Sequence, residues 1–257
     1  MVAPAGWGGA LMGGVLRFIA DNRGDVLQRL LEHVEISAIS LAIALLLALP
    51  LALWLGHNGK GGFVAINASN VGRALPSLAL IALAVPWGGL KPPTVIFALV
   101  LLGIPPILTN TFVGVRQVDP EVVEAARGMG MRSLQVLGKV ELPLAAPVIM
   151  AGIRTASVQI IATATLGALV ATGGLGTFIT DGLAVSDTAS ILTGALLVAV
   201  LAVLADAGFG LLERATTPTG VKLERGRGAP GTGPAGGPAT APAGGPAGIE
   251  TEKERTA

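Results

Sequence analysis

The most informative stretch of this chain is Glu124-Ala125-Ala126, followed by Gly130 and then by Val140-Glu141-Leu142-Pro143. It is charged, and it lies between two long apolar runs. Its pattern predicts two short helices with a sharp turn between them, and the second helix, over residues 133–140, ends near the closing proline. Most of the remaining sequence is apolar enough to cross a membrane, so this stretch is a polar segment among membrane spans.

The residues around the turn define the first helix. Asp119 can cap that helix, and Pro120 takes its first position, where a missing backbone N–H costs nothing. Gly128 and Gly130 allow the positive φ that a sharp reversal requires. We expect a rigid, exposed loop of this kind in a membrane protein to bind a soluble partner.

The spacing of the stretch resembles the cytoplasmic coupling loop of ABC-importer permeases: Glu-Ala-Ala, three residues, Gly, nine residues, an aliphatic residue, any residue, Leu-Pro. Val140 stands where that family usually has Ile. The surrounding sequence VDPEVVEAARGMGMRSLQVLGKVELPLAAPVIMAGIRTA is similar to permeases for osmoprotectants such as glycine betaine, carnitine and choline. Segments 75–80, 173–176 and 211–213 agree with that subfamily, and the resemblance covers roughly residues 25–215.

The resemblance implies a permease subunit that forms a translocation path and is not itself an enzyme. It implies three partners. The first is a cytoplasmic ABC ATPase, which binds the ATP and Mg. The second is another copy of this permease or a homologous permease, and the third is an extracytoplasmic solute-binding protein. This chain would bind no cofactor. The residues that the resemblance assigns to ATPase coupling are Glu124, Ala125, Ala126, Gly128, Gly130, Leu142 and Pro143.

Two other functions stay open at the level of sequence. One is an ABC permease for amino acids or another small polar solute, because the coupling loop does not discriminate between cargoes. The other is an ATPase-independent channel or membrane scaffold. An ordered loop argues against the second reading, since a channel has no need to display one.

Composition indicates an all-α, polytopic membrane protein surrounded by lipid, and the resemblance implies that this membrane is the cell's inner (plasma) membrane. The chain is 52% hydrophobic and 13% charged with a mean hydropathy of +0.72, whereas soluble domains carry about 25% charged residues. A net charge of +1 excludes a nucleic-acid-binding face. The chain has no cysteine, and His33 and His57 lack metal-ligand spacing, so we expect two interfacial histidines at the ends of the first span.

Apolar runs of about 20 residues predict five transmembrane helices. They are Ile36–Gly56, Phe63–Trp87, Pro92–Val115, Leu144–Ala171 and Thr188–Leu212. The second run has a polar first half and is interrupted by Pro76, and polar groups at membrane depth are tolerated where they face protein or water. We therefore expect this span to line a cavity.

The chain divides into three parts. Residues 1–32 are expected to form a loosely ordered or interfacial arm and, from residue 25 to 35, an amphipathic interfacial helix. Residues 33–215 form the transmembrane permease domain, with the coupling loop at about 119–143. Residues 216–257 form a Gly-, Pro- and Ala-rich cytoplasmic tail that is expected to be disordered, because it has few large apolar side chains to bury.

The distribution of Lys and Arg predicts that the coupling loop is cytoplasmic. Four basic residues lie between residues 116 and 139, whereas the loop after the second span carries only Lys91. Three arginines between residues 17 and 29 argue the other way, because an odd number of spans places the N-terminus outside. Their alternation with acidic residues favours an interfacial helix.

Polar residues within the spans are candidates for the translocation path, because charge is costly in a bilayer. Thr155, Gln159 and Thr163 share one helical face, although such a stripe can equally hydrogen-bond between helices. The alternative for an arginine is snorkelling to the interface or pairing with a carboxylate. The candidate path residues are Arg73, Pro76, Ser77, Arg154, Thr155, Gln159 and Thr163.

Aromatic residues are few: tyrosine is absent, and the three tryptophans lie at predicted span ends or in the N-terminal arm. A tight site for a quaternary ammonium ion usually needs an aromatic cage. We therefore expect solute recognition to reside in the separate binding protein.

Overall fold

The structure is a computed structural model that describes residues 7–59, 62–63, 67, 76–170 and 172–216. Within these residues all regular structure is helical, which confirms the all-α prediction. The α-helices are α1 (Trp7–Asp21), α2 (Arg23–His57), α4 (Ser77–Gly88), α5 (Pro92–Arg116), α6 (Pro120–Gly128), α7 (Ser133–Val136), α8 (Leu142–Ala164), α9 (Gly176–Val185) and α10 (Thr188–Thr216). A π-helix, η1 (Leu137–Glu141), precedes α8, and a 3-10 helix, η2 (Thr165–Val170), follows it.

The described part of the chain contains four helical segments that are long and apolar enough to cross a membrane. They are Arg23–His57, Pro92–Arg116, Ser133–Val170 and Thr188–Arg214. They include the first, third, fourth and fifth predicted spans. Of the second predicted span, α4 is the described second half, and most of the polar first half, including Arg73, lies outside the described residues. The chain is therefore a multi-pass membrane protein.

The N-terminal part is more helical than the sequence indicated. The amphipathic segment 25–35 is not a separate helix: α2 runs for 35 residues without a break, so the expected boundary at residue 32 falls inside it. The preceding residues, expected to be loosely ordered or interfacial, form α1 with 15 residues. The hydrogen bonds within a helix satisfy its backbone groups both in an amphipathic segment and in the apolar segment that follows. A change in side-chain composition alone therefore does not end a helix. The predicted tail lies outside the described residues from residue 217 onward.

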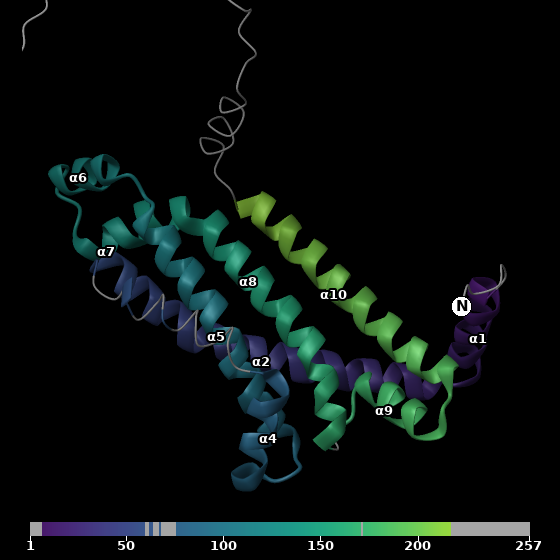
Figure 1. Ribbon diagram of the computed structural model, residues 1–257. Helices are drawn as coiled ribbons and strands as arrows, with labels where there is room; N and C mark the ends of the chain where they lie inside the picture. Colours follow the sequence, from purple (N-terminus) through teal and green to yellow (C-terminus); the bar gives the residue numbers. More distant parts are fainter. Residues whose placement is uncertain (1–6, 60–61, 64–66, 68–75, 171, 217–257) are drawn as a thin grey trace, which may run out of the picture.

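The core lies where α2, α5 and α8 pack against one another, and α10 packs along α8 (Figure 1). Buried Val95, Leu99 and Leu102 of α5 and Ile160 of α8 belong to one apolar cluster. Small residues let the helices approach closely, as is usual in membranes. At Gly152 a Cβ atom would lie 2.6 Å from the Cβ of Asn110, so α8 contacts α5 through the bare glycine.

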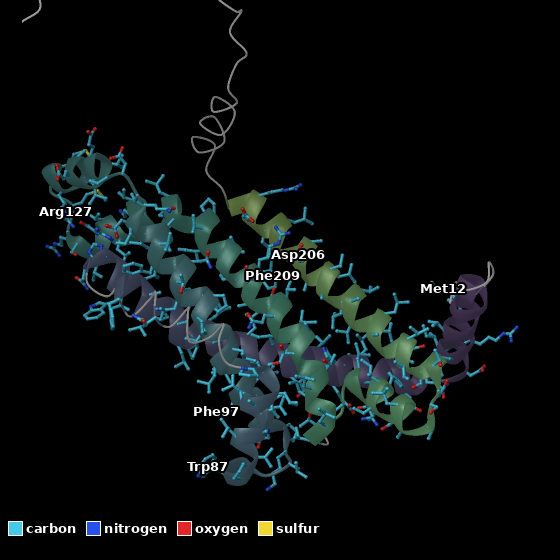
Figure 2. The ribbon with its side chains drawn as sticks, in the orientation of Figure 1. Met12, Trp87, Phe97, Arg127, Asp206 and Phe209 are labelled. Atoms are coloured by element: carbon cyan, nitrogen blue, oxygen red, sulfur yellow. The ribbon has the colours of Figure 1, made fainter. Side chains whose placement is uncertain are left out.

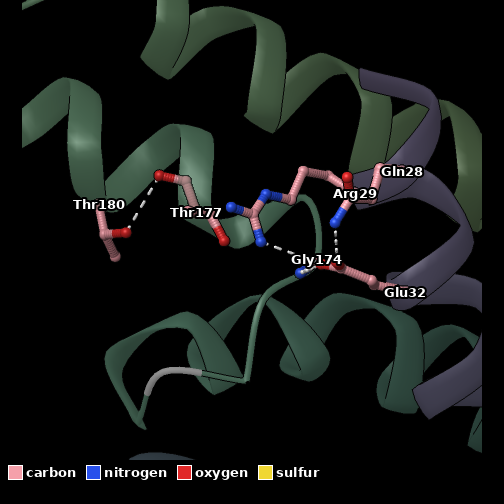
Figure 3. A network of polar contacts seen from close by, with 6 residues as sticks. All are labelled: Gln28, Arg29, Glu32, Gly174, Thr177 and Thr180. Atoms are coloured by element: carbon pink, nitrogen blue, oxygen red, sulfur yellow. Dashed lines mark hydrogen bonds and ion pairs between the residues drawn. The ribbon is translucent and has the colours of Figure 1, made fainter. Parts of the chain in front are cut away.

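One end of the bundle holds a polar network between α2 and the turn before α9 (Figure 3). The Glu32 carboxylate accepts from the Gly174 backbone N–H at 2.9 Å, from Gln28 at 2.9 Å and from Arg29 at 3.1 Å. Helix α9, which the apolar-run analysis missed because its 10 residues are too few to span a membrane, begins just after this turn. The network therefore fixes α9 beside the N-terminal half of α2.

The other end of the bundle carries the predicted coupling loop. Helix α7 lies beside the C-terminal end of α2, with α6 farther out at the upper left of Figure 1, whereas α1 and α9 lie at the opposite end. The charged loop and the Glu32 network are thus separated by the length of the long helices.

Candidate coupling site

The first helix of the coupling loop begins as its sequence predicts. Asp119 is the N-cap residue of α6, and its side chain accepts a hydrogen bond from the Glu121 N–H at 2.9 Å. Pro120 occupies the first position of the helix. Local chemistry alone fixes this helix start.

The turn after α6 explains why a glycine stands four residues after the Glu-Ala-Ala stretch. Gly130 has a φ of +83°, and its N–H donates to the Arg127 carbonyl at 2.9 Å. The Met131 N–H donates to the Ala126 carbonyl at 3.2 Å. This pair of bonds is a Schellman motif, in which the residue just past the helix adopts the left-handed conformation that favours glycine. Ala126, which is 3% exposed, is thus both a packing residue and the acceptor that closes the turn.

The expectation of a positive φ at Gly128 was wrong, whereas its assignment to ATPase coupling stays a prediction. Gly128 is the last residue of α6, and it is not among the described residues with positive φ. A single left-handed residue is sufficient to reverse the chain in a Schellman motif, so only Gly130 must be glycine on this ground.

The predicted end of the second helix near Pro143 was also wrong. The chain passes from α7 through the π-helix η1 directly into α8, and Pro143 lies in the first turn of α8. Proline has no backbone N–H, and a first-turn position needs none for an α-helical hydrogen bond. The wider π turn before α8 shifts the hydrogen-bond register, so Pro143 is accommodated there. The second half of the coupling loop, from Ser133 onward, is therefore a continuous helical extension of a membrane-spanning helix.

The loop exposes apolar side chains between charged ones. Val122, Met129 and Leu134 are 43%, 77% and 80% exposed. Glu124 and Arg127 of α6 are also exposed, and Figure 2 shows Arg127 at the outer end of the molecule. Large exposed apolar side chains among charged ones are typical of a protein-binding site. This surface can receive a partner by burying the apolar side chains and pairing the charged ones.

The opposite side of the loop is anchored in the bundle. Val118 is buried in an apolar cluster with Val115 of α5 and Ile149 of α8, and Leu142 packs against that cluster. The coupling loop is thus attached at both ends to membrane-spanning helices that pack against each other.

A third attachment of the loop comes from α2, and the sequence did not predict it. The His57 Nδ1 atom lies 2.6 Å from an oxygen of Glu141, and its Nε2 atom lies 2.5 Å from the Ser133 hydroxyl. His57 was expected to be an interfacial histidine, and no local pattern signals a contact across 84 residues. Within the described residues, no group of three or more His, Asp or Glu side chains could hold a metal ion.

One candidate path residue, Arg154, has a charged partner on another helix. Arg154 of α8 forms a two-pronged ion pair with Asp206 of α10, one of the alternatives that the sequence left open. The two side chains are 41% and 38% exposed, and Asp206 is visible on α10 in Figure 2. The pair joins two membrane-spanning helices.

The other path candidates are scattered. Thr155 is exposed and donates to the Ala151 carbonyl at 2.9 Å, whereas Gln159 and Thr163 are half-buried. Pro76 and Ser77 begin α4, which packs against α5, so they lie on a different helix pair from Arg154. The structure does not bring the α4 and α8 candidates together within one chain.

Comparison with known proteins agrees with this geometry. Residues 38–218 match the family described as "Binding-protein-dependent transport system inner membrane component". The chain is 38% identical, over 81% of its length and 96% of the relative, to the choline transport system permease protein OpuBB of Bacillus subtilis (strain 168). It is 36% identical to the glycine betaine/carnitine/choline transport system permease protein OpuCB of the same organism, over 82% and 97% of the two chains.

A solved structure of the MetNI methionine ABC transporter, in an inward-facing conformation, shares the fold. Its TM-score is 0.68 at 19% identity, and the match covers 76% of this chain and 98% of that one. Together, the family match and the relatives show that the chain belongs to the binding-protein-dependent transport system inner membrane components, as a permease subunit of an ABC importer.

Proposed function

We propose that this permease imports compatible solutes of the glycine betaine, carnitine and choline kind across the plasma membrane. The observation that carries the proposal is the identity to permeases named for these solutes along four-fifths of the chain. Membership of the family implies an ATPase partner and, in general, a solute-binding protein. A second permease, either another copy or a homologue, completes the passage in this proposal.

The coupling loop is the site proposed for the ATPase. Its exposed Glu124 and Ala125 lie on the outer side of α6, and the Ala126–Gly130 turn holds that helix at a fixed angle. Leu142 and Pro143 begin α8, so a displacement of the loop is passed directly into a membrane-spanning helix. ATP and Mg bind to the ATPase in this scheme, and the permease contributes the moving passage.

The solute path is proposed along the polar face of α8 that contains Thr155, Gln159 and Thr163, with Arg154 as a further candidate on the same helix. Residues 73–77 before and at the start of α4 are proposed to contribute to the path, with Arg73, Pro76 and Ser77 as the candidates. The chain has no tyrosine, and Trp54 and Trp87 are 61% and 84% exposed, away from the bundle core. Weak contacts along the path suit an importer whose binding protein captures the solute, because a tight second site would slow release.

Reconstitution tests the proposal. The complex that co-purifies with this chain is placed in proteoliposomes with ATP inside and the solute-binding protein outside, and uptake of labelled glycine betaine, carnitine and choline is measured. ATP-dependent uptake of at least one of these solutes is expected, with no competition from a large excess of methionine or histidine. Uptake of amino acids alone would overturn the substrate class. Solute flux without an ATPase would instead support a channel.

A further inference from the structure

His57, at the C-terminal end of α2, contacts both ends of the second half of the coupling loop. Ser133 is the first residue of α7, and Glu141 is the last residue of η1. The two ring nitrogens of His57 lie 2.5 Å and 2.6 Å from the Ser133 hydroxyl and the Glu141 carboxylate. We call these three residues the His57 cluster. One imidazole therefore holds nine residues of loop against α2, since Ser133 and Glu141 bound the segment.

The contact with Glu141 lies in a dry environment. The His57 and Glu141 side chains are 9% and 6% exposed. A buried carboxylate needs a hydrogen-bond donor or an opposite charge, because desolvation penalises an unpaired ion. The Nδ1–H of His57 supplies the donor whether the ring is neutral or protonated. In the neutral tautomer with its proton on Nδ1, Nε2 is free to accept from the Ser133 hydroxyl, so both ring nitrogens have a partner.

The cluster connects a helix that the chain itself does not connect to the loop. Helix α8 continues directly from η1, and α5 leads into α6 through residues 117–119. The chain itself therefore connects both helices to the loop. Helix α2 is separated from the loop in sequence and meets it at the His57 cluster. Close beside this contact, a Cβ at Gly56 would lie 2.9 Å from the Cβ of Val115, so the end of α2 is also packed against α5.

We propose that His57 is a positioning residue for energy coupling: through Glu141 and Ser133, it makes α2 move together with the coupling loop when the ATPase displaces that loop. The inference rests on the proposed ATPase-coupling function. Without the cluster, the loop moves α5 and α8, to which the chain connects it, while α2 lags behind, and ATP is hydrolysed without opening the passage fully.

The variants separate charge, hydrogen bonding and packing. His57→Leu fills similar space, removes both contacts and strands Glu141. His57→Asn keeps a donor near the position of Nδ1 and should retain part of the function. Glu141→Gln keeps the shape and a hydrogen-bond acceptor for His57. His57→Leu combined with Glu141→Leu removes the stranded charge, so it restores stability without restoring the connection.

The main readout is the number of solute molecules imported per ATP hydrolysed by the reconstituted complex. In His57→Leu we expect this ratio to fall at least about fivefold, the lower end of typical coupling between sites, while ATP hydrolysis continues. His57→Asn should lie between His57→Leu and wild type. The variant with both His57→Leu and Glu141→Leu should recover the wild-type melting temperature but keep the low ratio of solute imported to ATP hydrolysed. If His57 had only a structural role, the ratio would recover together with the melting temperature.

A distance measurement tests the motion itself. The chain has no cysteine, so spin labels on this chain attach only to cysteines introduced at exposed Leu47 of α2 and exposed Lys139 of η1. In the wild-type background the label–label distance should stay constant between the nucleotide-free and ATP-bound states. In His57→Leu it should change. A wild-type transport ratio in His57→Leu, or an unchanged distance, overturns the inference, whereas absent ATP-driven uptake by the wild-type complex overturns the proposed function instead.

Discussion

Replacing Gly130 by valine isolates the backbone conformation of the coupling loop from its contacts. Gly130 has a φ of +83°, and a Cβ built there meets nothing within 4 Å. The substitution therefore causes no collision within this chain and acts through the backbone alone. A residue other than glycine in the left-handed region costs about 1–2 kcal/mol, and a β-branched residue resists that region most strongly.

This cost sets the size of the expected effect. A penalty of about 1–2 kcal/mol corresponds to a factor of roughly 5–30 in a conformational equilibrium. The docking-competent turn becomes less populated, and the apparent affinity for the ATPase falls by up to that factor. Membrane insertion should be unaffected, because the turn lies outside the apolar spans.

The assay titrates purified ATPase onto the permease in nanodiscs and measures the dissociation constant alongside solute uptake. Gly138→Val is the matched control, since a Cβ at Gly138 also meets nothing within 4 Å and its φ is not positive. Gly130→Asn should recover much of the affinity, because asparagine tolerates the left-handed region better than valine. Wild-type affinity and uptake in a well-expressed Gly130→Val variant would refute the role given to this turn.

Three further predictions concern the bundle and the path. Arg154→Ala leaves Asp206 without its partner within a membrane-spanning helix, so less protein should reach the membrane. Removing both charges should restore the abundance of the protein on immunoblots, and a failure to recover would contradict the pairing. Gly152→Leu should destabilise the bundle by about 1–3 kcal/mol, because its Cβ would lie 2.6 Å from that of Asn110. Gly208→Leu, with open space at its Cβ, should leave the melting temperature unchanged; equal melting temperatures for the two variants would rule out the close α5–α8 contact. Isolated permease in nanodiscs should bind glycine betaine with a dissociation constant of about 1 mM or weaker, which corresponds to a binding free energy of roughly 4 kcal/mol or less. A micromolar dissociation constant by calorimetry would be incompatible with recognition by a separate binding protein.

Local signals in the sequence were sufficient for much of the fold. Apolar runs located the first, third, fourth and fifth spans, because the hydrocarbon core sets the length of a crossing helix. Asp119 and Pro120 placed the start of α6, and Gly130 placed the turn after it. Each of these features depends on residues within a few positions of one another. The resemblance of the same stretch to coupling loops was enough to indicate the permease family.

Local signals were insufficient where two conformations satisfy the same pattern. Gly128 and Gly130 both permit a positive φ, and only the hydrogen bonds to Ala126 and Arg127 select Gly130. Pro143 can end a helix or begin one, and the π turn before it decides for the beginning. The amphipathic segment before the first span can lie flat or continue the span, and in the structure it continues.

The class of protein, its main spans and the loop that identifies its family could therefore be predicted from the sequence. Which distant polar groups meet could be seen only once the helices were packed together. Arg154 and Asp206 are 52 residues apart, and His57 and Glu141 are 84 residues apart. No periodicity encodes such pairs, because their meeting depends on how α2, α8 and α10 pack. Burying charge is costly, so once packing brings these groups together, the pairs become the contacts that hold the helices in position.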